Sequence, residues 1–271
     1  MTNEDKISAT SLFWDANPCD GQNDFEARKK FRYLKEPWIL PKIEEIARKH
    51  GDVLEIGCGQ GVDGLVMCGV MPPGSSYVGL ELSEASLDSA RLSAQQLAGQ
   101  LNVTPLYRQG NAENLGFESD SFECVYSMGV LHHTPDTENA LREVHRVLAP
   151  GGKVYITLYR TFSPKILAAL LLRRIQGCCD GILSSERIFY QLLRKASSER
   201  FWGTALLECF GVPILESFTC REIRELFSNF EEVHIKTVSL GLPATGINKF
   251  FDPLAFFLGS MWFVEATKEN K

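Results

Sequence analysis

A glycine-rich segment follows the first strongly apolar run of the chain and is its clearest sign of chemistry. The run Val53–Ile56 leads directly into glycines at positions 57, 59 and 61. Because glycine has no Cβ atom, such a loop turns tightly and lets a ligand lie against the backbone. Glu55 adds a carboxylate to the apolar run, where a buried charge is costly unless it meets a donor or a cation. The segment therefore predicts a ligand site that includes an acid.

Two cofactor classes use a loop of this kind. A dinucleotide site requires Gly-x-Gly-x-x-Gly, which Gly59, Gly61 and Gly64 satisfy, although this frame begins two residues late. Glu81, 22 residues beyond Gly59, matches the acid that binds a ribose in such a site. The loop alone leaves both classes open. Glu55 favours a ligand that carries an ammonium and a sulfonium, because it would repel a pyrophosphate.

The elements that position this loop follow from the apolar periodicity. Strands are predicted at residues 53–56, 77–80, 103–108, 122–127, 153–159, 233–240 and 261–267. Helices are predicted at residues 37–49, 83–98, 136–148, 162–175, 188–195 and 219–230. Strands that alternate with helices predict right-handed βαβ units around a parallel sheet, and therefore an α/β fold.

The chain divides into a cap and a main domain. Residues 1–50 are a predicted helical N-terminal cap, and residues 51–271 a single α/β domain with a helical insertion at about 160–217. The insertion contains eight Lys or Arg against five Asp or Glu, and its aliphatic run 166–172 precedes Arg173 and Arg174. A solvated helix face is the simplest interpretation. A peripheral membrane contact, or a basic cover over an anionic or lipid-like substrate, is the alternative.

The composition limits the class of protein. The 271 residues are 44% hydrophobic and 23% charged, as is typical of a globular protein, and the net charge of −6 argues against a nucleic-acid partner. The polar N-terminus lacks the apolar core of a secretory signal, and no aliphatic run approaches the length of a membrane span. The eight cysteines form no Cys-x-x-Cys pair. We expect a cytoplasmic protein with no bound metal, and no pattern indicates its oligomeric state.

Five segments in a fixed order resemble the class I S-adenosylmethionine-dependent methyltransferases, particularly the ubiquinone/menaquinone-type enzymes. They are VLEIGCGQG (53–61), VGLELS (78–83), GNAENLGF (110–117), FECVYSMGVLHH (122–133) and RVLAPGGK (146–153). The resemblance covers about residues 52–160. It implies a Rossmann-like seven-stranded sheet of order 3-2-1-4-5-7-6, with one antiparallel strand and with S-adenosyl-L-methionine as the cofactor.

The resemblance also implies the cofactor contacts. The loop would lie beneath the methionine part of the cofactor, Glu55 would hold its amino group, and Glu81 would accept the ribose hydroxyls. Asn111 stands where the family commonly has Asp, and it still offers an oxygen to the adenine amino group. The complete predicted set is Glu55, Gly57, Cys58, Gly59, Gln60, Gly61, Glu81, Leu82, Asn111, Ala112, Glu113, Ser127 and Met128.

The reaction implied is direct methyl transfer to an oxygen, nitrogen or carbon of a small acceptor molecule. His132 and His133 are candidate general bases, since histidine accepts a proton near neutral pH. Trp14 and Tyr33 are candidate contacts to an apolar or aromatic acceptor. Two alternatives remain: a cofactor-binding regulator without turnover, and a transferase that uses a modified sulfonium donor.

Overall fold

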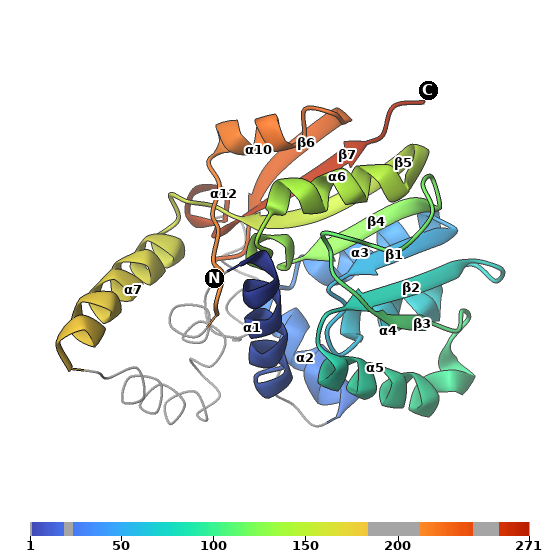
Figure 1. Ribbon diagram of the computed structural model, residues 1–271. Coiled ribbons are helices and arrows are strands. Elements are labelled where there is room, and N and C mark those ends of the chain that lie inside the picture. The colour runs from blue at the N-terminus through green and yellow to red at the C-terminus, as the bar shows by residue number, and fades with distance from the viewer. Residues whose placement is uncertain (1, 19–23, 184–211, 241–254, 271) are drawn as a thin grey trace.

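Seven apolar runs form the strands of one twisted sheet (Figure 1). The computed structural model describes residues 2–18, 24–183, 212–240 and 255–270. The strands are β1 (Asp52–Ile56), β2 (Ser76–Glu81), β3 (Leu106–Gln109), β4 (Phe122–Met128), β5 (Leu148–Tyr159), β6 (Glu231–Val238) and β7 (Met261–Thr267). Their order is β3-β2-β1-β4-β5-β7-β6, and β7 is antiparallel to both of its neighbours while the other pairs are parallel. The order and the reversed strand confirm the expected fold.

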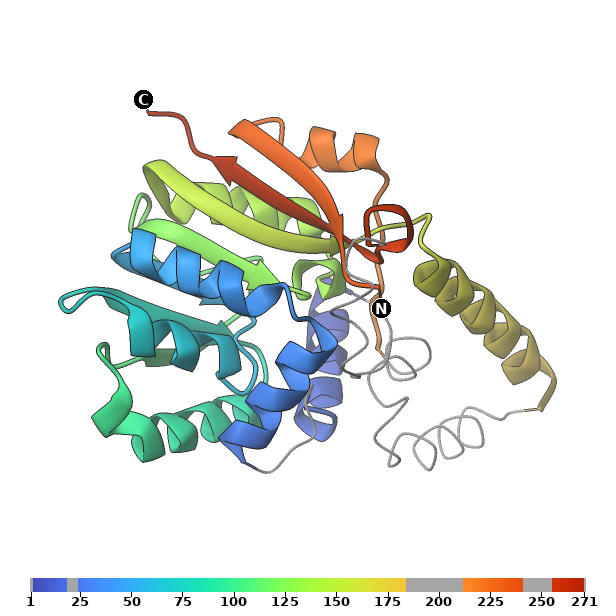
Figure 2. The same cartoon turned by 180° about the vertical axis from the view of Figure 1, so that it is seen from behind.

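Helices cover both faces of the sheet (Figure 2). In the described residues they are α1 (Asn3–Ala16), α2 (Phe25–Lys35), α3 (Ile39–Lys49), α4 (Val62–Val70), α5 (Glu84–Leu97), α6 (Thr137–Val147), α7 (Pro164–Leu183), α10 (Cys220–Leu226) and α12 (Ala255–Leu258), with 3-10 turns η1 (Ala98–Gln100) and η2 (Leu131–His133). Helices α3 and α4 pack on one face, and α6 and α10 pack on the other. Helix α7 extends away from the sheet.

Each predicted strand is present, with ends that differ by a few residues. The third strand begins at Leu106 rather than at residue 103. Pro105 precedes it and has no N–H group to donate to a ladder. The fifth strand begins early, because Leu148 already pairs with Phe122 across an irregularity in the register.

The predicted helices also differ mainly at their ends. The first predicted helix begins at Ile39, so Pro37 lies in the turn before it rather than in its first turn. Helix α7 is longer than the predicted 162–175, and α10 is shorter than the predicted 219–230. The helix predicted at 188–195 lies outside the described residues.

Helix α3 shows how the sequence produces the packing. Ile39, Ile43, Ile46 and Ala47 recur at helical spacing and are all buried. They pack against β1 residue Val53 and its neighbours on one face of the sheet. Burial of each large aliphatic side chain contributes about 1.5–3 kcal/mol, so this stripe holds the helix directly behind the start of β1.

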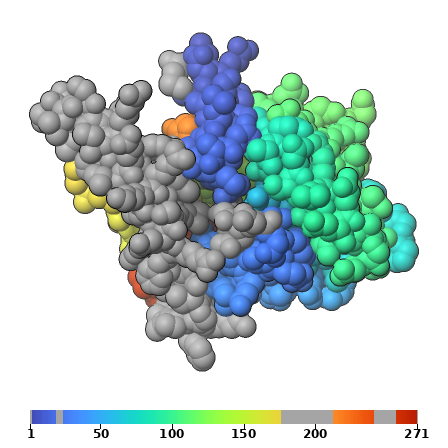
Figure 3. All heavy atoms as spheres, turned by 90° about the horizontal axis from the view of Figure 1, so that it is seen from below, coloured from blue at the N-terminus to red at the C-terminus, as the bar shows by residue number. Residues whose placement is uncertain are grey.

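The two N-terminal helices are attached to the main domain by polar contacts. Arg28 of α2 donates from Nη2 to Ser93 Oγ on α5 at 2.6 Å. At the end of α1, Asp15 Oδ1 accepts from Ser83 Oγ at 2.7 Å and from the backbone N of Ala85 at 3.3 Å. Figure 3 shows these helices, in blue, lying against the teal surface to which α5 contributes. The N-terminal region is therefore held beside the carboxyl end of β2.

Candidate functional site

The glycine loop joins β1 to α4 and lies over the end of β2. Gly57, Gly59 and Gly61 have φ values of 75°, 52° and 79°, a region that residues with a Cβ rarely adopt. The N–H of Gly57 donates to the carbonyl of Leu80 at 2.7 Å. A Cβ at Gly57 would lie 2.3 Å from Val130 Cγ2, whereas one at Gly59 would meet nothing within 4 Å. Gly57 is thus required by packing, and Gly59 leaves its outer side open.

A pocket opens at this edge of the sheet, where the carboxyl ends of β1, β2 and β4 meet. It has an empty volume of about 1010 Å³, its open mouth included. Open α/β sheets bind their ligands at this edge. The predicted site residues that line it are Trp14, Glu55, Gly57, Cys58, Gly59, Gln60, Glu81, Leu82, Asn111, Ala112, Met128 and His133. Ten of the thirteen expected cofactor residues thus line one cavity, whereas Gly61, Glu113 and Ser127 do not line it.

Glu81 at the end of β2 is fixed by three backbone donors. Its Oε2 accepts from the N–H of Gly59 at 2.9 Å, and its Oε1 accepts from Leu82 at 2.9 Å and Ser83 at 3.0 Å. Burial raises the pKa of Glu81, and these three donors oppose that rise. The carboxylate keeps lone pairs for further donors, such as the two hydroxyls of a ribose.

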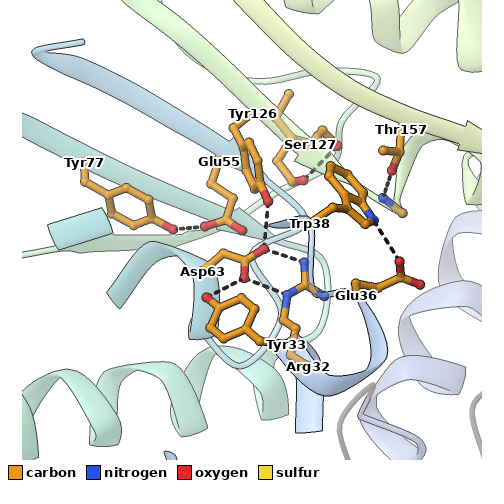
Figure 4. A network of polar contacts seen from close by, with 12 residues as sticks. Arg32, Tyr33, Glu36, Trp38, Glu55, Asp63, Tyr77, Tyr126, Ser127 and Thr157 are labelled. Carbon is orange, nitrogen blue, oxygen red and sulfur yellow. Dashed lines mark hydrogen bonds and ion pairs between the residues drawn. The ribbon is translucent and has the colours of Figure 1, made fainter. Parts of the chain in front are cut away.

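Glu55 lies on the sheet face that α3 and α4 cover. The strand register places it opposite Tyr126 of β4, and Tyr77 of β2 lies on the same face. The hydroxyl of Tyr77 donates to Glu55 Oε2 (Figure 4). Burial first, and the nearby carboxylate of Asp63 second, raise the pKa of Glu55. Glu55 is therefore a buried acid that a bound cation would ionise.

Asp63 in the first turn of α4 is a second buried acid at the pocket, and the sequence reasoning did not identify it. Arg32 of α2 forms a two-pronged ion pair with it, with Nε 2.6 Å from Oδ1. Tyr33 donates to Oδ1 at 3.1 Å, and Tyr126 donates to Oδ2 at 2.8 Å (Figure 4). Tyr33, predicted as an acceptor contact, thus belongs to this network and does not line the pocket.

Arg32 and Asp63 both line the pocket. The signal that would have revealed them was available, because Asp63 is a lone acid in the otherwise apolar helix Val62–Val70. The argument applied to Glu55 holds equally for Asp63, since a buried charge requires a partner.

Two predicted contacts follow β3. Asn111 lines the pocket, but its Oδ1 accepts from the backbone N of Glu113 at 3.0 Å and forms a local turn. The Glu113 carboxylate lies away from the pocket lining and accepts from the N–H of Asp136 at 2.8 Å. The carbonyl of Glu113 accepts from Asn139 at 2.9 Å. Glu113 therefore attaches the loop after β3 to the start of α6.

The end of β4 forms the opposite wall of the pocket. Met128 faces the cavity, whereas Ser127 is fully buried and donates from Oγ to the carbonyl of Ile56 at 3.0 Å. Gly129, which follows Met128, donates its N–H to Thr157 Oγ1 at 2.8 Å. Ser127 thus joins β4 to β1 beside the glycine loop rather than lining the pocket.

The two histidines of η2 occupy different environments. His132 is completely buried, with its ring centroid 3.7 Å from that of Tyr159, and burial lowers its pKa well below the ordinary value. It does not line the pocket. His133 does line the pocket, and its Nδ1 lies 2.7 Å from the carbonyl oxygen of Ile214. Because a carbonyl can only accept, Nδ1 carries the proton and Nε2 is the basic nitrogen of the neutral ring.

Trp14 of α1 borders the pocket beside His133. The two ring centroids are 5.8 Å apart in an edge-on arrangement. The N-terminal region therefore contributes an apolar ring to the same end of the pocket as the histidine.

The ionisable groups that line the pocket are mainly acidic. Glu55, Asp63 and Glu81 supply three carboxylates, and Arg32 is the one Lys or Arg among the described lining residues. Such a wall favours a cation with a smaller anionic part and opposes a pyrophosphate. No group of three His, Cys, Asp or Glu that could hold a metal ion occurs among the residues that the structure describes.

Comparison with known proteins agrees with this geometry. Residues 54–156 match the family model described as a methyltransferase domain. Ubiquinone biosynthesis O-methyltransferases from Pseudomonas aeruginosa and Pseudomonas syringae are 32% and 31% identical over 139 residues, which is 51% of this chain and 56% of each relative. The chain thus spans little more than half the length of the curated relatives that it matches.

Solved structures share the fold at lower identity. A SAM-dependent methyltransferase from Thermotoga maritima superimposes with a TM-score of 0.56 at 17% identity, over 96% of this chain and all of that chain. The cyclase SpnF superimposes with a TM-score of 0.58 at 15% identity, over 98% of this chain and 94% of that chain. By its sheet order the chain shares the fold of these structures, and its residues 54–156 are similar to a methyltransferase domain.

Proposed function

We propose that the protein transfers a methyl group from S-adenosyl-L-methionine to an oxygen, nitrogen or carbon atom of a small apolar or aromatic molecule. The names of the curated relatives favour oxygen. The observation that carries the proposal is the pair of acids, the buried Glu55 and the half-buried Glu81, at either side of an open glycine loop.

The residues of the pocket fit this cofactor. Glu81 has remaining lone pairs for the ribose hydroxyls, and Asn111 and Ala112, which line the pocket, would contact the adenine. Glu55 would accept from the ammonium group, and Arg32 offers the positive charge that a carboxylate requires. Gly59 leaves room for the methionine part, because nothing lies within 4 Å of its missing Cβ.

The chemistry that the bound cofactor supplies is a methyl group on a positively charged sulfur, with a neutral thioether as the leaving group. The protein must therefore align the acceptor atom with the methyl carbon and sulfur, which contributes on the order of 7–11 kcal/mol in well-arranged systems. Trp14 and Met128 border this region and would exclude water from it.

His133 would remove the proton that the acceptor loses. As the acceptor atom takes the methyl group that the cofactor supplies, its proton would pass to Nε2 of His133. His132 is a weaker candidate, because its ring is buried away from the pocket lining. General base catalysis of this type contributes about 10²–10⁴ in rate.

The acceptor would be enclosed by parts outside the cofactor segments. We propose the N-terminal region, residues 1–50, as a cap that supplies Trp14, and the insertion at about 160–217 as a cover over the acceptor. Trp14 lies 5.8 Å from His133, measured between ring centroids, which supports the first assignment. Tyr33 would act only indirectly, through Asp63.

Two other functions use the same cofactor site. A regulator without turnover would bind the cofactor, and a transferase with a modified sulfonium donor would move a different group. The fold does not separate these functions, because the cyclase SpnF shares it. The ordered Nδ1–H form of His133 favours catalysis, since a silent binding protein has no need of a basic nitrogen at the pocket.

The deciding experiment has two parts. Calorimetry should show binding of S-adenosylmethionine and its demethylated product, and no binding of NADH. Incubation with cofactor labelled in the methyl group and a metabolite extract should then give labelled product together with S-adenosylhomocysteine. Binding without product in any extract would favour the regulator, and NADH binding alone would end the proposal.

We propose a membrane surface as a further partner, which the insertion would contact peripherally. Apolar side chains are exposed on α7 and α12 and in the turn before α7, namely Phe162, Leu167, Leu171, Ile175, Phe256 and Phe257. An apolar acceptor dissolved in a membrane would be reached from such a face. No helix among the described residues has the length and apolarity needed to span a bilayer. Sedimentation with anionic vesicles tests the contact, and Leu171→Glu should reduce it; equal sedimentation with and without vesicles would exclude it.

A further inference from the structure

The last of the five segments that resemble methyltransferases does not line the pocket, and the site described so far gives it no part. It begins at Arg146, in the last turn of α6. The guanidinium of Arg146 donates from Nη1 to the carbonyl of Phe117 at 2.7 Å. This bond joins residues 146–153 to residues 110–117, which follow β3 and line the pocket with their first three residues. We call the latter the 110–117 loop.

Arg146 also holds the carboxylate of Glu143, about one turn earlier on α6. Its Nε lies 2.7 Å from Glu143 Oε1, and its Nη2 lies 2.8 Å from Oε2. A two-pronged pair of this kind fixes the plane of the carboxylate as well as its position. The hydrogen bonds from Arg146 lower the pKa of Glu143, so the carboxylate is ionised at neutral pH.

Glu143 in turn binds the backbone of the 110–117 loop. Its Oε2 accepts from the N–H of Leu115 at 2.9 Å. Asn139, four residues earlier on α6, donates from Nδ2 to the carbonyl of Glu113 at 2.9 Å. Side chains four and seven residues apart lie on one face of a helix, so Asn139, Glu143 and Arg146 form one row. The row contacts three alternate residues of the loop.

The sheet and the core place the loop beside α6. Strand β3 is the first in the sheet order and pairs with β2 over four residues. Leu115 is buried in the same apolar cluster as Val144 of α6. Apolar burial is not directional, so it does not set the orientation of the peptide groups of the loop. The polar row of α6 sets that orientation.

A tight turn connects the row with the pocket. The backbone N of Glu113 donates to Asn111 Oδ1, and the backbone N of Asn114 donates to the Asn111 carbonyl, each at 3.0 Å. Asn111 lines the pocket, two residues before the carbonyl that Asn139 binds. Because hydrogen bonds close this turn, a displacement at Leu115 should move Asn111 as well.

We propose that Glu143, which Arg146 orients, is a positioning residue that holds the 110–117 loop in the form that recognises the adenine ring. This inference rests on the proposed function, in which Asn111 and Ala112 contact the adenine of the cofactor. It assigns a part in cofactor recognition to α6 and to the segment that begins at Arg146, neither of which lines the pocket.

The test compares Glu143→Ala with Glu143→Gln in the 271-residue protein. Glutamine keeps an oxygen that can accept from Leu115, whereas alanine removes the acceptor. Asn139→Ala removes the neighbouring bond to the loop and should act in the same direction as Glu143→Ala. Glu138→Ala is the matched control, because Glu138 lies on the same helix, is exposed and pairs with Arg142. Urea denaturation should show that all four variants unfold cooperatively.

The first readout is the preference for adenine over hypoxanthine. Calorimetry gives the affinities for S-adenosylhomocysteine and for S-inosylhomocysteine, in which an oxygen replaces the amino group of the base. The wild type should bind the adenine compound about tenfold more tightly, as expected for one hydrogen bond from the amino group. Glu143→Ala should lose most of this preference, whereas Glu143→Gln should keep most of it and Glu138→Ala all of it.

Three results of this measurement would overturn the proposal. They are a wild type without the preference, a preference that Glu143→Ala leaves unchanged, and a loss of affinity in Glu143→Ala that is equal for both compounds. The last result would indicate a general structural effect. If S-adenosylhomocysteine does not bind to the wild type, the proposed function fails and this inference fails with it. Binding with an unchanged preference would end the inference alone.

The second readout is the division of the effect between KM and kcat in methyl transfer. Glu143→Ala should raise KM for S-adenosylmethionine about tenfold and leave kcat at saturating cofactor nearly unchanged, because the adenine is bound but does not react. Glu143→Gln should show a smaller rise in KM, and Glu138→Ala none. A fall in kcat with an unchanged KM would overturn the proposal.

Discussion

The two ends of the pocket are built in different ways. At the cofactor end, Glu81 is tied to Gly59 and Ser83, and all of these residues come from two successive strand–helix connections. At the acceptor end, His133 is tied to Ile214 and bordered by Trp14, so that three distant parts of the chain meet there. The first end is a local structure that a short motif specifies. The second end is an assembly of distant segments, so in the proposed function a substitution there should change the acceptor preference and leave the first end intact.

The largest expected effect is the loss of turnover on substitution of His133, because this change affects one end of the pocket and leaves the other intact. His133→Ala should leave cofactor affinity nearly intact and lower turnover about 10²–10⁴-fold, because it removes the general base and nothing that contacts the cofactor-binding acids. Calorimetry and a methyl-transfer assay measure the two quantities separately. His145→Ala is the matched control, since His145 packs against Phe230 away from the pocket. Unchanged turnover would show that His133 is not the general base and has only a structural role.

The second effect tests whether the N-terminal region is held by the cofactor end. Asp63→Ala leaves Arg32 without its carboxylate and removes the acceptor of Tyr33 and Tyr126. Loss of one partner of a buried ion pair costs about 3–5 kcal/mol, and the partial exposure of Arg32 places the expected loss near the lower value. Urea denaturation measures the loss.

The matched control for Asp63 is Asp88→Ala. Asp88 is an exposed acid that pairs with Arg91, and its loss should change the free energy of unfolding by less than about 1 kcal/mol. Equal losses in the two variants would show that the buried network does not stabilise the domain. In that case the N-terminal region would be held mainly by its apolar contacts.

The third effect measures the cofactor end alone. Glu81→Ala removes the acceptor of three backbone N–H groups and of the proposed ribose contact. Charge-assisted hydrogen bonds of this kind contribute about 1.5–3 kcal/mol each, so cofactor affinity should fall at least tenfold. Glu81→Gln keeps one accepting oxygen and should fall between the alanine variant and the wild type. Calorimetry measures the cofactor affinity of the wild type, Glu81→Gln and Glu81→Ala, and this order of decreasing affinity is expected.

The sequence predicted the fold and the convergence of Gly59 and Glu81, but not the contacts around His133. Gly59 and Glu81 lie 22 residues apart in consecutive units, so periodicity and spacing are sufficient to bring them together. The contact of His133 with Ile214 spans 81 residues and uses a backbone carbonyl, which has no signature in residue types. The sequence marks Asp63, because it is a lone acid in an apolar helix. It does not mark the partner Arg32, because tertiary contacts set the angle at which α2 packs.

The smallest expected effect is the pH dependence of cofactor affinity, which arises at Glu55. Burial and the nearby Asp63 raise the pKa of Glu55 to about 8, so the carboxyl is protonated in the free protein at neutral pH. A bound ammonium favours the ionised form and lowers this pKa, so binding releases a proton. Cofactor affinity should therefore rise with pH up to about 8, by at most about tenfold per pH unit, which is 1.4 kcal/mol. Calorimetry across this range, in buffers of different ionisation enthalpy, measures both the affinity and the proton.

Stability should change in the opposite direction over the same range. In the unfolded chain Glu55 has an ordinary pKa near 4.5, below its folded value, so the unfolded state binds fewer protons between about 4.5 and 8. The free energy of unfolding of the free protein should fall as pH rises through this window. Glu55→Gln has no proton to lose, so its stability should fall less steeply and its cofactor affinity should be weaker and flat with pH. In the proposed function turnover depends on pH through His133. This pH dependence of turnover should remain in the variant, because His133 contacts Ile214 and Trp14 rather than Glu55. If instead both dependences disappear together, the two ends are one coupled unit.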